Sequence, residues 1–156
     1  MVRLVAFNLD DHGYALPLQA VERVIRAVEI TPLPNAPAIV LGILNVGGRV
    51  IPVVNIRQCF RLPGREIEPR DQLILGQTGR RTIALAVDEV SGVVERPENE
   101  IVSAHEILPG LDGVEGVVML EDGMILIYDL NKFLSLEQEA ALDEALARTQ
   151  DVDETG

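Results

Sequence analysis

The sequence predicts a mainly β fold made of two similar small barrels that lie side by side, followed by one α-helix. The first observation is an internal repeat, in which residues 42–56 (GILNVGGRVIPVVNI) align without a gap on residues 116–130 (GVVMLEDGMILIYDL). The second is an upstream pair that also aligns without a gap, residues 14–26 (YALPLQAVERVIR) and 83–95 (IALAVDEVSGVVE). These segments are rich in Val, Ile and Leu, and such a repeat indicates two stacked copies of one supersecondary unit.

The first copy is expected to contain several short strands. They are predicted at residues 3–9, 14–18, 23–28, 40–46 and 49–56. Gly47 and Gly48 favour a tight two-residue hairpin between the last two strands. Pro52 has no N–H group to donate to a neighbouring strand, so its strand is expected to lie at an edge or to bend. Residues 57–71 are polar and broken by prolines, which predicts a short helical turn and then a linker.

The second copy is expected to repeat this arrangement. Its strands are predicted at residues 72–78, 82–88, 91–95, 114–121 and 124–130. Turn signals occur at Thr78-Gly79 and at Asp122-Gly123, and the latter places this turn one residue later than in the first copy. The predicted subdomains are therefore residues 10–70 and 72–130, with the first strand packing across both.

The C-terminal segment predicts the helix, at residues 135–148. Ser135 can cap its first turn, and Gln138 stands three residues later, which is the spacing of a capping box. The helix is expected to pack across both subdomains, and residues 149–156 are expected to form an acidic, disordered tail. From Glu137 onward the chain carries seven acidic residues against the single base Arg148.

The composition of the chain limits the classes of function that we expect for it. The 156 residues are 47% apolar, enough for one domain or two small lobes with a common core. No apolar run approaches the roughly 18 residues of a membrane span, and the N-terminus lacks the pattern of a signal peptide, so we expect a cytosolic protein without membrane insertion. The net charge of −12 argues against nucleic acid as a partner, as does the scarcity of aromatic residues.

Several predicted strands are apolar at consecutive positions rather than at alternate ones. These runs are residues 39–41, 53–54, 117–120 and 124–127. Because successive side chains point to opposite faces of a sheet, both faces of such strands need cover. The cover comes either from the other lobe or from a partner protein, and an apolar face left exposed marks a partner surface.

The residues that usually carry out chemistry are sparse. His12 and His105 lack a second ligand at metal-site spacing, and Cys59 has no histidine near it in the sequence. The adjacent acids Asp88-Glu89 and Glu121-Asp122 face opposite ways on a strand, so we interpret them as solvated turn charges. The sequence therefore predicts no catalytic residue, no metal and no cofactor. The alternative is a small-molecule-binding double barrel, or an enzyme with a site between the lobes. It requires a polar cavity, which these strands do not suggest.

Residues 30–57 (ITPLPNAPAIVLGILNVGGRVIPVVNIR) resemble the signature stretch of the CheW family of chemotaxis coupling proteins, and residues 14–26 and 123–143 fit the same family. The resemblance covers about residues 3–147. It implies two five-stranded SH3-like barrels around a shared apolar core. It also implies a non-enzymatic cytoplasmic adaptor, recruited to receptor arrays at the inner membrane. Such an adaptor joins the tips of methyl-accepting chemoreceptors to the regulatory domain of a CheA-type histidine kinase, in chemotaxis or a related two-component pathway.

The resemblance also assigns candidate interaction residues. The family motif Asn-Leu-Arg-Gly falls on residues 45–48, so its Arg is replaced by Gly47, and Arg49 stands two residues on. In the motif that follows, Asn55 replaces an Asp while Arg57 matches. The implied receptor-groove residues are Val21, Val24, Asn45, Gly47, Arg49 and Arg57. The implied kinase-facing residues are Gly42 and Ile43. The departures bear on the receptor partner rather than on the fold.

Overall fold

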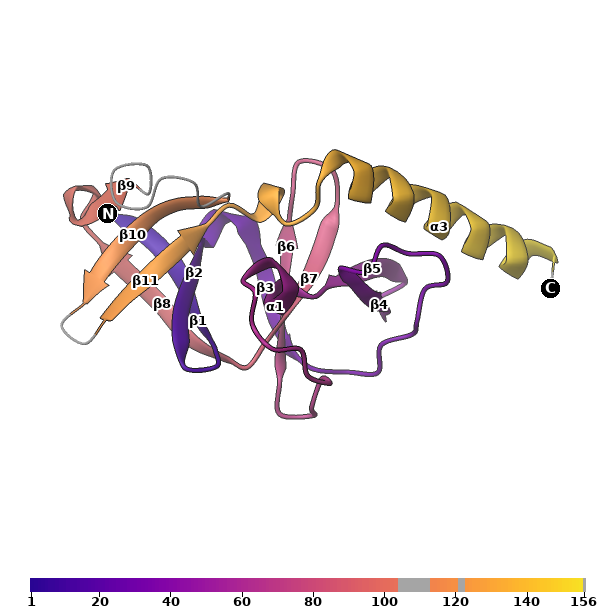
Figure 1. Cartoon of the computed structure of the whole chain (residues 1–156), viewed down its shortest axis with the longest axis horizontal. Helices are drawn as coiled ribbons and strands as arrows, with labels where there is room; N and C mark the ends of the chain where they lie inside the picture. The colour runs from indigo at the N-terminus through magenta and orange to yellow at the C-terminus, as the bar shows by residue number, and fades with distance from the viewer. Residues whose placement is uncertain (104–112, 121–122, 156) are drawn as a thin grey trace.

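The computed structural model describes residues 1–103, 113–120 and 123–155 of the chain, with side chains as far as Arg148. The strands of these residues form a six-stranded and a five-stranded sheet, which occupy the left and the right of Figure 1. One long helix, α3 (Leu136–Thr155), lies at the C-terminal end. The predicted mainly β fold with two modules and a C-terminal helix is confirmed.

We call the six-stranded sheet sheet 1 and the five-stranded sheet sheet 2. Sheet 1 has the order β8-β1-β2-β11-β10-β9 and sheet 2 the order β3-β6-β7-β5-β4. The strands of sheet 1 are β1 (Val2–Leu9), β2 (His12–Pro17), β8 (Glu89–Arg96), β9 (Ile101–Ser103), β10 (Val114–Leu120) and β11 (Gly123–Tyr128). Those of sheet 2 are β3 (Val21–Arg26), β4 (Val40–Val46), β5 (Arg49–Val54), β6 (Gln72–Gln77) and β7 (Thr82–Val87). The short strand β9 is one that the sequence did not predict.

The two copies of the repeat exchange strands. The chain leaves sheet 1 through the 3-10 turn η1 (Leu18–Ala20) and returns to it at Asp88, so β3 and β8 each lie in the opposite sheet to the strand before them. The predicted subdomain boundaries, 10–70 and 72–130, are therefore wrong. Sheet 2 uses residues 21–87, and sheet 1 uses the strands on either side of that range. The strands are grouped in this way because the parallel pair in each sheet joins a strand of one copy to a strand of the other, β2 with β11 and β5 with β7.

The strand registers of the two sheets are equivalent. Ala15 pairs with Ile127 in sheet 1, and the residues aligned with them in the repeat, Ala84 and Val53, pair in sheet 2. Both hairpins close with the same spacing, since β4 pairs with β5 as far as residues 46 and 49 and β10 pairs with β11 as far as residues 120 and 123. The predicted one-residue shift of the second turn is therefore wrong, and Gly123 belongs to β11.

Pro52 does not mark an edge strand, because β5 lies between β7 and β4. The parallel pairing of β5 with β7 begins at Val53, directly after the proline. The equivalent pairing of β11 with β2 begins earlier, at Ile125. The missing N–H group of Pro52 thus coincides with a shortened parallel ladder, and this is how a central strand accommodates the proline.

Three clusters of buried apolar residues hold the fold together. One cluster lies within sheet 1 and includes Leu4 and Val118, which belong to non-adjacent strands, so the sheet curls around it. A second cluster within sheet 2 includes Leu44 and Leu75, also from non-adjacent strands. The third and largest contains residues of both sheets and of α3. The consecutive apolar runs are explained by these clusters, because strands such as β5 bury one face in their own sheet and the other face in the shared core.

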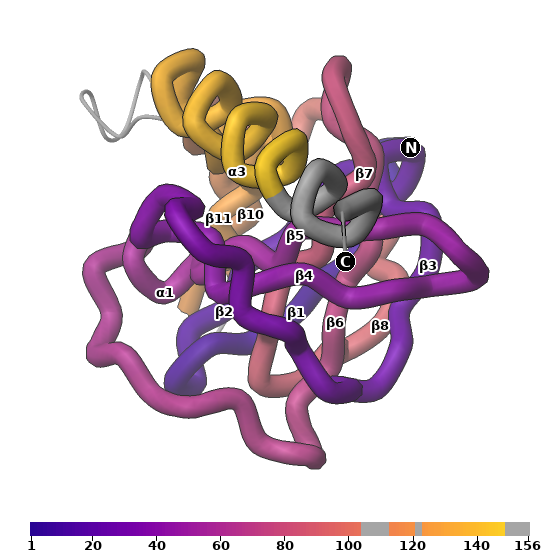
Figure 2. Tube along the Cα trace, turned by 90° about the vertical axis from the view of Figure 1, so that its right-hand side faces the viewer, coloured from indigo at the N-terminus to yellow at the C-terminus, as the bar shows by residue number. Residues whose placement is uncertain are grey.

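Helix α3 begins with the predicted capping box. The Ser135 N–H donates to Gln138 Oε1 at 2.8 Å, and the Gln138 N–H donates to Ser135 Oγ at 3.1 Å. The helix extends to Thr155, so the predicted end at residue 148 and the predicted disordered tail are wrong as far as that residue. No Gly or Pro occurs between residues 136 and 155 to end it. Figures 1 and 2 show α3 extending toward the side of the molecule that carries β4 and β5.

Helix α3 is held to the body by apolar and ionic contacts. Leu142 and Ala145 are buried in the shared core. Arg81, at the start of β7, forms ion pairs with Glu139 at 2.8 Å and with Asp143. Glu139 is itself only 4% exposed, so its pairing with Arg81 removes the cost of an isolated buried carboxylate.

Candidate protein-interaction site

Three of the predicted groove residues lie around the hairpin between β4 and β5. Gly47 and Gly48 have φ angles of 59° and 86°, which glycine adopts without a steric cost and which form the predicted tight turn. The Gly48 N–H donates to Asn45 Oδ1 at 2.9 Å, so the Asn45 side chain fixes the turn. Asn45, Gly47 and Arg49 are exposed, so the resemblance assigned them to a region that is open to a partner.

An ion pair brings this hairpin next to β3. The register of β3 against β6 shifts between Val21 and Arg23, which leaves Glu22 at a β-bulge. The Arg49 Nη2 lies 2.6 Å from Glu22 Oε1. Hydrogen bonding to Arg49 lowers the pKa of the Glu22 carboxyl. Val21 and Val24 are half-buried beside this pair on β3, an edge strand of sheet 2. The structure thus places three of the six residues assigned to the receptor groove at the β4–β5 hairpin and two on β3, and the ion pair between Arg49 and Glu22 joins these two elements.

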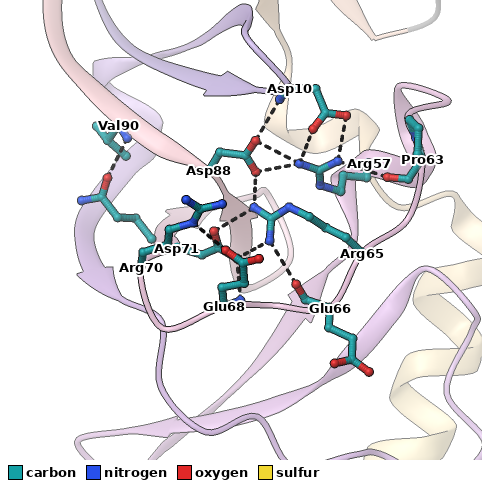
Figure 3. Close-up of polar contacts among 11 residues, drawn as sticks. Asp10, Arg57, Pro63, Arg65, Glu66, Glu68, Arg70, Asp71, Asp88 and Val90 are labelled. Carbon is teal, nitrogen blue, oxygen red and sulfur yellow. Dashed lines mark hydrogen bonds and ion pairs between the residues drawn. The ribbon is translucent and has the colours of Figure 1, made fainter.

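Arg57 is the sixth, and its side chain lies in a different environment (Figure 3). It is 7% exposed and stands in the short helix α1 (Ile56–Cys59). Its guanidinium donates to both oxygens of Asp10, at 2.9 and 3.0 Å, and to both oxygens of Asp88, at 2.7 and 3.0 Å. It also donates to the carbonyl of Pro63 at 3.1 Å. The prediction of an accessible groove residue is therefore wrong for Arg57, because these contacts use its guanidinium within the molecule.

Asp88 links Arg57 to a second arginine. The Arg65 Nη2 donates to Asp88 Oδ1 at 2.6 Å, and the same guanidinium forms two hydrogen bonds of 2.8 Å with the buried carboxylate of Asp71. Figure 3 shows the chain of contacts running from Asp10 to Asp71. We call these five residues the seam network: Asp10, Arg57, Arg65, Asp71 and Asp88. The network joins the β1–β2 turn, α1, the linker and the point where the chain returns to sheet 1.

The seam network keeps its carboxylates ionised. Hydrogen bonding to Arg57 lowers the pKa of Asp10. Burial acts to raise the pKa of Asp88, but the Asp10 N–H and the two guanidinium groups outweigh it and the pKa is lowered. The interpretation of Asp88 as a solvated turn charge is therefore wrong. The sequence carried no local signal for these contacts, because the partners of Asp88 lie 23 to 78 residues away along the chain.

The two residues assigned to the kinase-facing surface differ in exposure. Gly42 is buried, and a Cβ atom added there would lie 2.5 Å from the Thr31 carbonyl oxygen. This approach is close because Thr31 and Ile43 form an isolated β-bridge through two hydrogen bonds of 2.8 Å. Gly42 is therefore required by backbone packing, whereas Ile43 is half-buried and the neighbouring Leu41 is exposed.

Large apolar side chains are exposed on both sheets. Met119 and Met124 pair across the hairpin between β10 and β11 and are 62% and 48% exposed. Val93 on β8 is 58% exposed and Val50 on β5 is 51% exposed. The apolar runs in the sequence indicated such positions without showing which members of each run would be uncovered.

The described side chains that could bind a metal or act as a nucleophile do not form a cluster. Among the described residues, no three His, Cys, Asp or Glu side chains are arranged to hold a metal ion. His12 is exposed at the start of β2, and His105 lies outside the described residues. Burial raises the pKa of the Cys59 thiol to about 11, so it is not a thiolate at neutral pH. Within the described chain, no helix has the length and apolar character to cross a bilayer.

Comparison with known proteins decides the family. The CheW-like domain matches residues 3–138. The chain belongs to the CheW-like family. It is 31% identical to the chemotaxis protein CheW of Rhizobium meliloti over 141 residues, which cover 88% of this chain and 91% of that protein. It is 28% identical to the chemotaxis protein CheW of Bacillus subtilis, with 92% and 94% covered.

The fold of this CheW-like chain also matches a solved structure. The scaffolding protein TtCheW from Thermoanaerobacter tengcongensis aligns with a TM-score of 0.79 and 28% identity, over 88% of this chain and 94% of that one. Because the alignment covers 88% of this chain, the shared fold is not limited to one of its two sheets.

Proposed function

We propose that this chain is a non-enzymatic signalling adaptor that couples chemoreceptors to a CheA-type histidine kinase. The observation that carries the proposal is the CheW-like match over residues 3–138, which spans both sheets. It is supported by relatives that are named chemotaxis proteins and by a structural relative that is named a scaffolding protein. The adaptor acts in the cytoplasm and is recruited to receptor arrays, in flagellar chemotaxis or a related pathway.

The mechanism is geometric. A helical receptor tip packs against the edge strand β3, where Val21 and Val24 offer half-buried apolar surface beside the exposed Arg49. The kinase regulatory domain docks at the outer edge of sheet 2, on β4, where Ile43 and Leu41 are accessible. Gly42 and Arg57 act on these surfaces indirectly. Gly42 sets the path of β4, and Arg57 holds the seam network together. Each contact has a dissociation constant on the order of micromolar, and strength comes from several linked contacts.

The test is co-sedimentation of the purified chain with a CheA-type kinase and a chemoreceptor signalling fragment. We expect the chain to pellet with both, and to bind each separately. Absence of pelleting at every stoichiometry contradicts the adaptor proposal. The two separate binding measurements show which half of the coupling persists with Gly47 in place of the motif arginine.

A single substitution tests the receptor surface. Val21→Asp places a charge on the proposed apolar contact and should weaken receptor binding about tenfold or more, while kinase binding stays unchanged. Val102→Asp is the matched control, because Val102 is also half-buried but lies on β9 at the far edge of sheet 1. A folded Val21→Asp variant that binds the receptor normally removes β3 from the proposed surface.

A further inference from the structure

Sheet 1 contains an open apolar pocket where β2 and β11 begin. Its volume is about 790 Å³, which lies in the range of small-molecule sites. Its walls include five half-buried apolar side chains, Phe60, Leu62, Leu120, Ile125 and Leu126. Phe60 stacks on Tyr14 with ring centroids 4.2 Å apart, so this wall is rigid.

The equivalent place in sheet 2 is closed. In the repeat, Ile51 and Pro52 are aligned with Ile125 and Leu126, and both sheet 2 residues are buried while both sheet 1 residues are half-buried. The ion pair between Arg49 and Glu22 spans the opening of sheet 2. The duplicated framework is therefore the same, and the difference lies in the side chains at the opening.

Small residues replace that ion pair in sheet 1. Gly123 is aligned with Arg49, and Ser91 is aligned with Glu22, and both line the pocket. Gly13 lines the pocket too and occupies the register position that Thr82 has in sheet 2. Three side chains of sheet 2, those of Arg49, Glu22 and Thr82, thus have shorter counterparts among the residues that line the pocket of sheet 1.

The charges around the pocket favour a cation. Among the described residues that line the pocket, Asp11 is the one carboxylate and is exposed; they also include His12 but no Lys or Arg. The chain as a whole carries a net charge of −12, and a negative field raises the local concentration of cations. Asn8 and Ser91, joined by a hydrogen bond of 3.4 Å, add polar groups at the opposite rim.

We propose that this pocket binds a small amphipathic organic cation, with an apolar body against Leu120 and Ile125 and an ammonium group at Asp11. The site is separate from the proposed receptor surface on β3 and the proposed kinase surface on β4, and it does not depend on them. Because the pocket is open and holds one exposed carboxylate, we expect a dissociation constant on the order of 0.1–1 mM for a small probe.

Three probes that share an apolar body test the class of ligand. They are phenylbutylammonium, phenylbutanol and phenylbutyrate, titrated into the full chain and followed by two-dimensional NMR. We expect saturable shifts of the Ala6, Gly13 and Ile125 amides with the ammonium probe, weaker shifts with the alcohol and none with the carboxylate. The amides of Thr78 and Gly79, at the far end of sheet 2, should not move.

Two substitutions test the residues. Asp11 has a left-handed backbone with a φ of 66°, which Asn tolerates, so Asp11→Asn should fold normally. It should weaken binding of the ammonium probe about two- to fivefold, which is the range of one exposed ion pair. Glu98→Gln, at an exposed carboxylate outside the pocket, should change nothing. Gly13→Thr installs the sheet 2 residue, and its Cβ meets Ile125 at an ordinary 3.4 Å. It should weaken all binding about tenfold or more.

Any of three results overturns the proposal. The first is absence of saturable shifts at pocket amides in the unmodified chain, which requires no variant to fold. The second is equal binding of the cation, the alcohol and the carboxylate, which denies a role to Asp11. The third is retained binding in a folded Gly13→Thr chain, which places the ligand elsewhere. Failure of the adaptor proposal would leave these outcomes unaffected, because they are measured without kinase or receptor.

Discussion

Arg57 and Arg49 were both assigned to one surface by resemblance, but the structure places them in contrasting regions. Arg57 lies in the seam network, 7% exposed, and forms ion pairs with Asp10 and Asp88. Arg49 lies at the opening of sheet 2, and its side chain is 46% exposed in its pair with Glu22. The same chemical group therefore links residues of the two sheets in one place and lies exposed at the surface in the other.

The difference shows how burial decides what an ion pair contributes. An exposed ion pair is solvated and screened in the folded and in the unfolded chain, so its net contribution to the free energy of unfolding is about 0–1 kcal/mol. Removing one partner of a buried pair leaves carboxylates desolvated without a counter-charge, which costs about 3–5 kcal/mol. An arginine that matches a family motif is therefore not necessarily a contact residue. The following substitutions separate a role in stability from a role in partner binding.

The largest effect is expected at Arg57. Arg57→Met keeps most of the apolar stem and removes the guanidinium from two carboxylates that are 38% and 27% exposed, so we expect the free energy of unfolding to fall by about 2 kcal/mol, which is below the range for a fully buried pair. The measurement is urea denaturation followed by circular dichroism. Arg23→Met is the control, because Arg23 is exposed on β3 and should change stability by less than about 0.5 kcal/mol. Equal effects of the two would mean that the seam network does not stabilise the fold.

A second large effect is expected at Gly42, which extends the comparison to the kinase-facing residues. Gly42→Ala places a methyl group against the Thr31 carbonyl oxygen, and we expect a loss of about 2 kcal/mol. Gly64→Ala is the matched control, since an added Cβ there meets no atom within 4 Å. If Gly42→Ala weakens kinase binding while its unfolding midpoint matches that of Gly64→Ala, Gly42 is a contact residue rather than a packing one.

Acid should weaken the seam network. The pKa of Asp71 and of Asp88 is lowered in the folded chain although burial acts to raise both, because Arg65 donates to each and because backbone N–H groups add to it. Their stabilising contribution is therefore present above the unfolded pKa of about 4 and is lost as the pH falls through the folded pKa. We expect this loss, measured by urea denaturation between pH 7 and pH 3, to be on the order of 1 kcal/mol.

The Arg65→Met variant provides the control for the pH dependence. It removes the guanidinium that lowers both pKa values, so its stability should fall less between pH 7 and pH 3 than that of the unmodified chain. Parallel pH profiles for the two chains would show that other carboxylates dominate acid unfolding and would remove the seam network from the explanation.

Much of the fold could be predicted because its information is local. Ten of the eleven strands were predicted to within a few residues, since apolar β-branched runs end at Gly, Pro or polar turns. The capping box at Ser135 was predicted for the same reason. The exchange of strands between the sheets could not be predicted, because it depends on parallel pairs such as Ala15 with Ile127, which are far apart in the sequence.

The site was less predictable than the fold. The turn at Gly47 and Gly48 was predicted because adjacent residues form it, whereas the hydrogen bond by which Asn45 fixes the turn came only from the structure. The seam network was missed because its contacts join Asp10 to Arg57 and Arg65 to Asp88 across different turns and a linker. A charged residue in a turn is usually solvated, and only the three-dimensional path of the chain shows which of them is enclosed.

The smallest effect is expected at the opening of sheet 2, and it completes the comparison. A double-mutant cycle with Arg49→Ala and Glu22→Ala should give a coupling energy below about 1 kcal/mol, which 1 M NaCl should largely abolish. Receptor binding should nevertheless respond to Arg49→Ala, because an exposed charge contributes more to recognition than to stability. A coupling energy as large as the stability loss expected for Arg57→Met would place Arg49 among the structural residues as well, and the contrast between the two arginines would then rest on position alone.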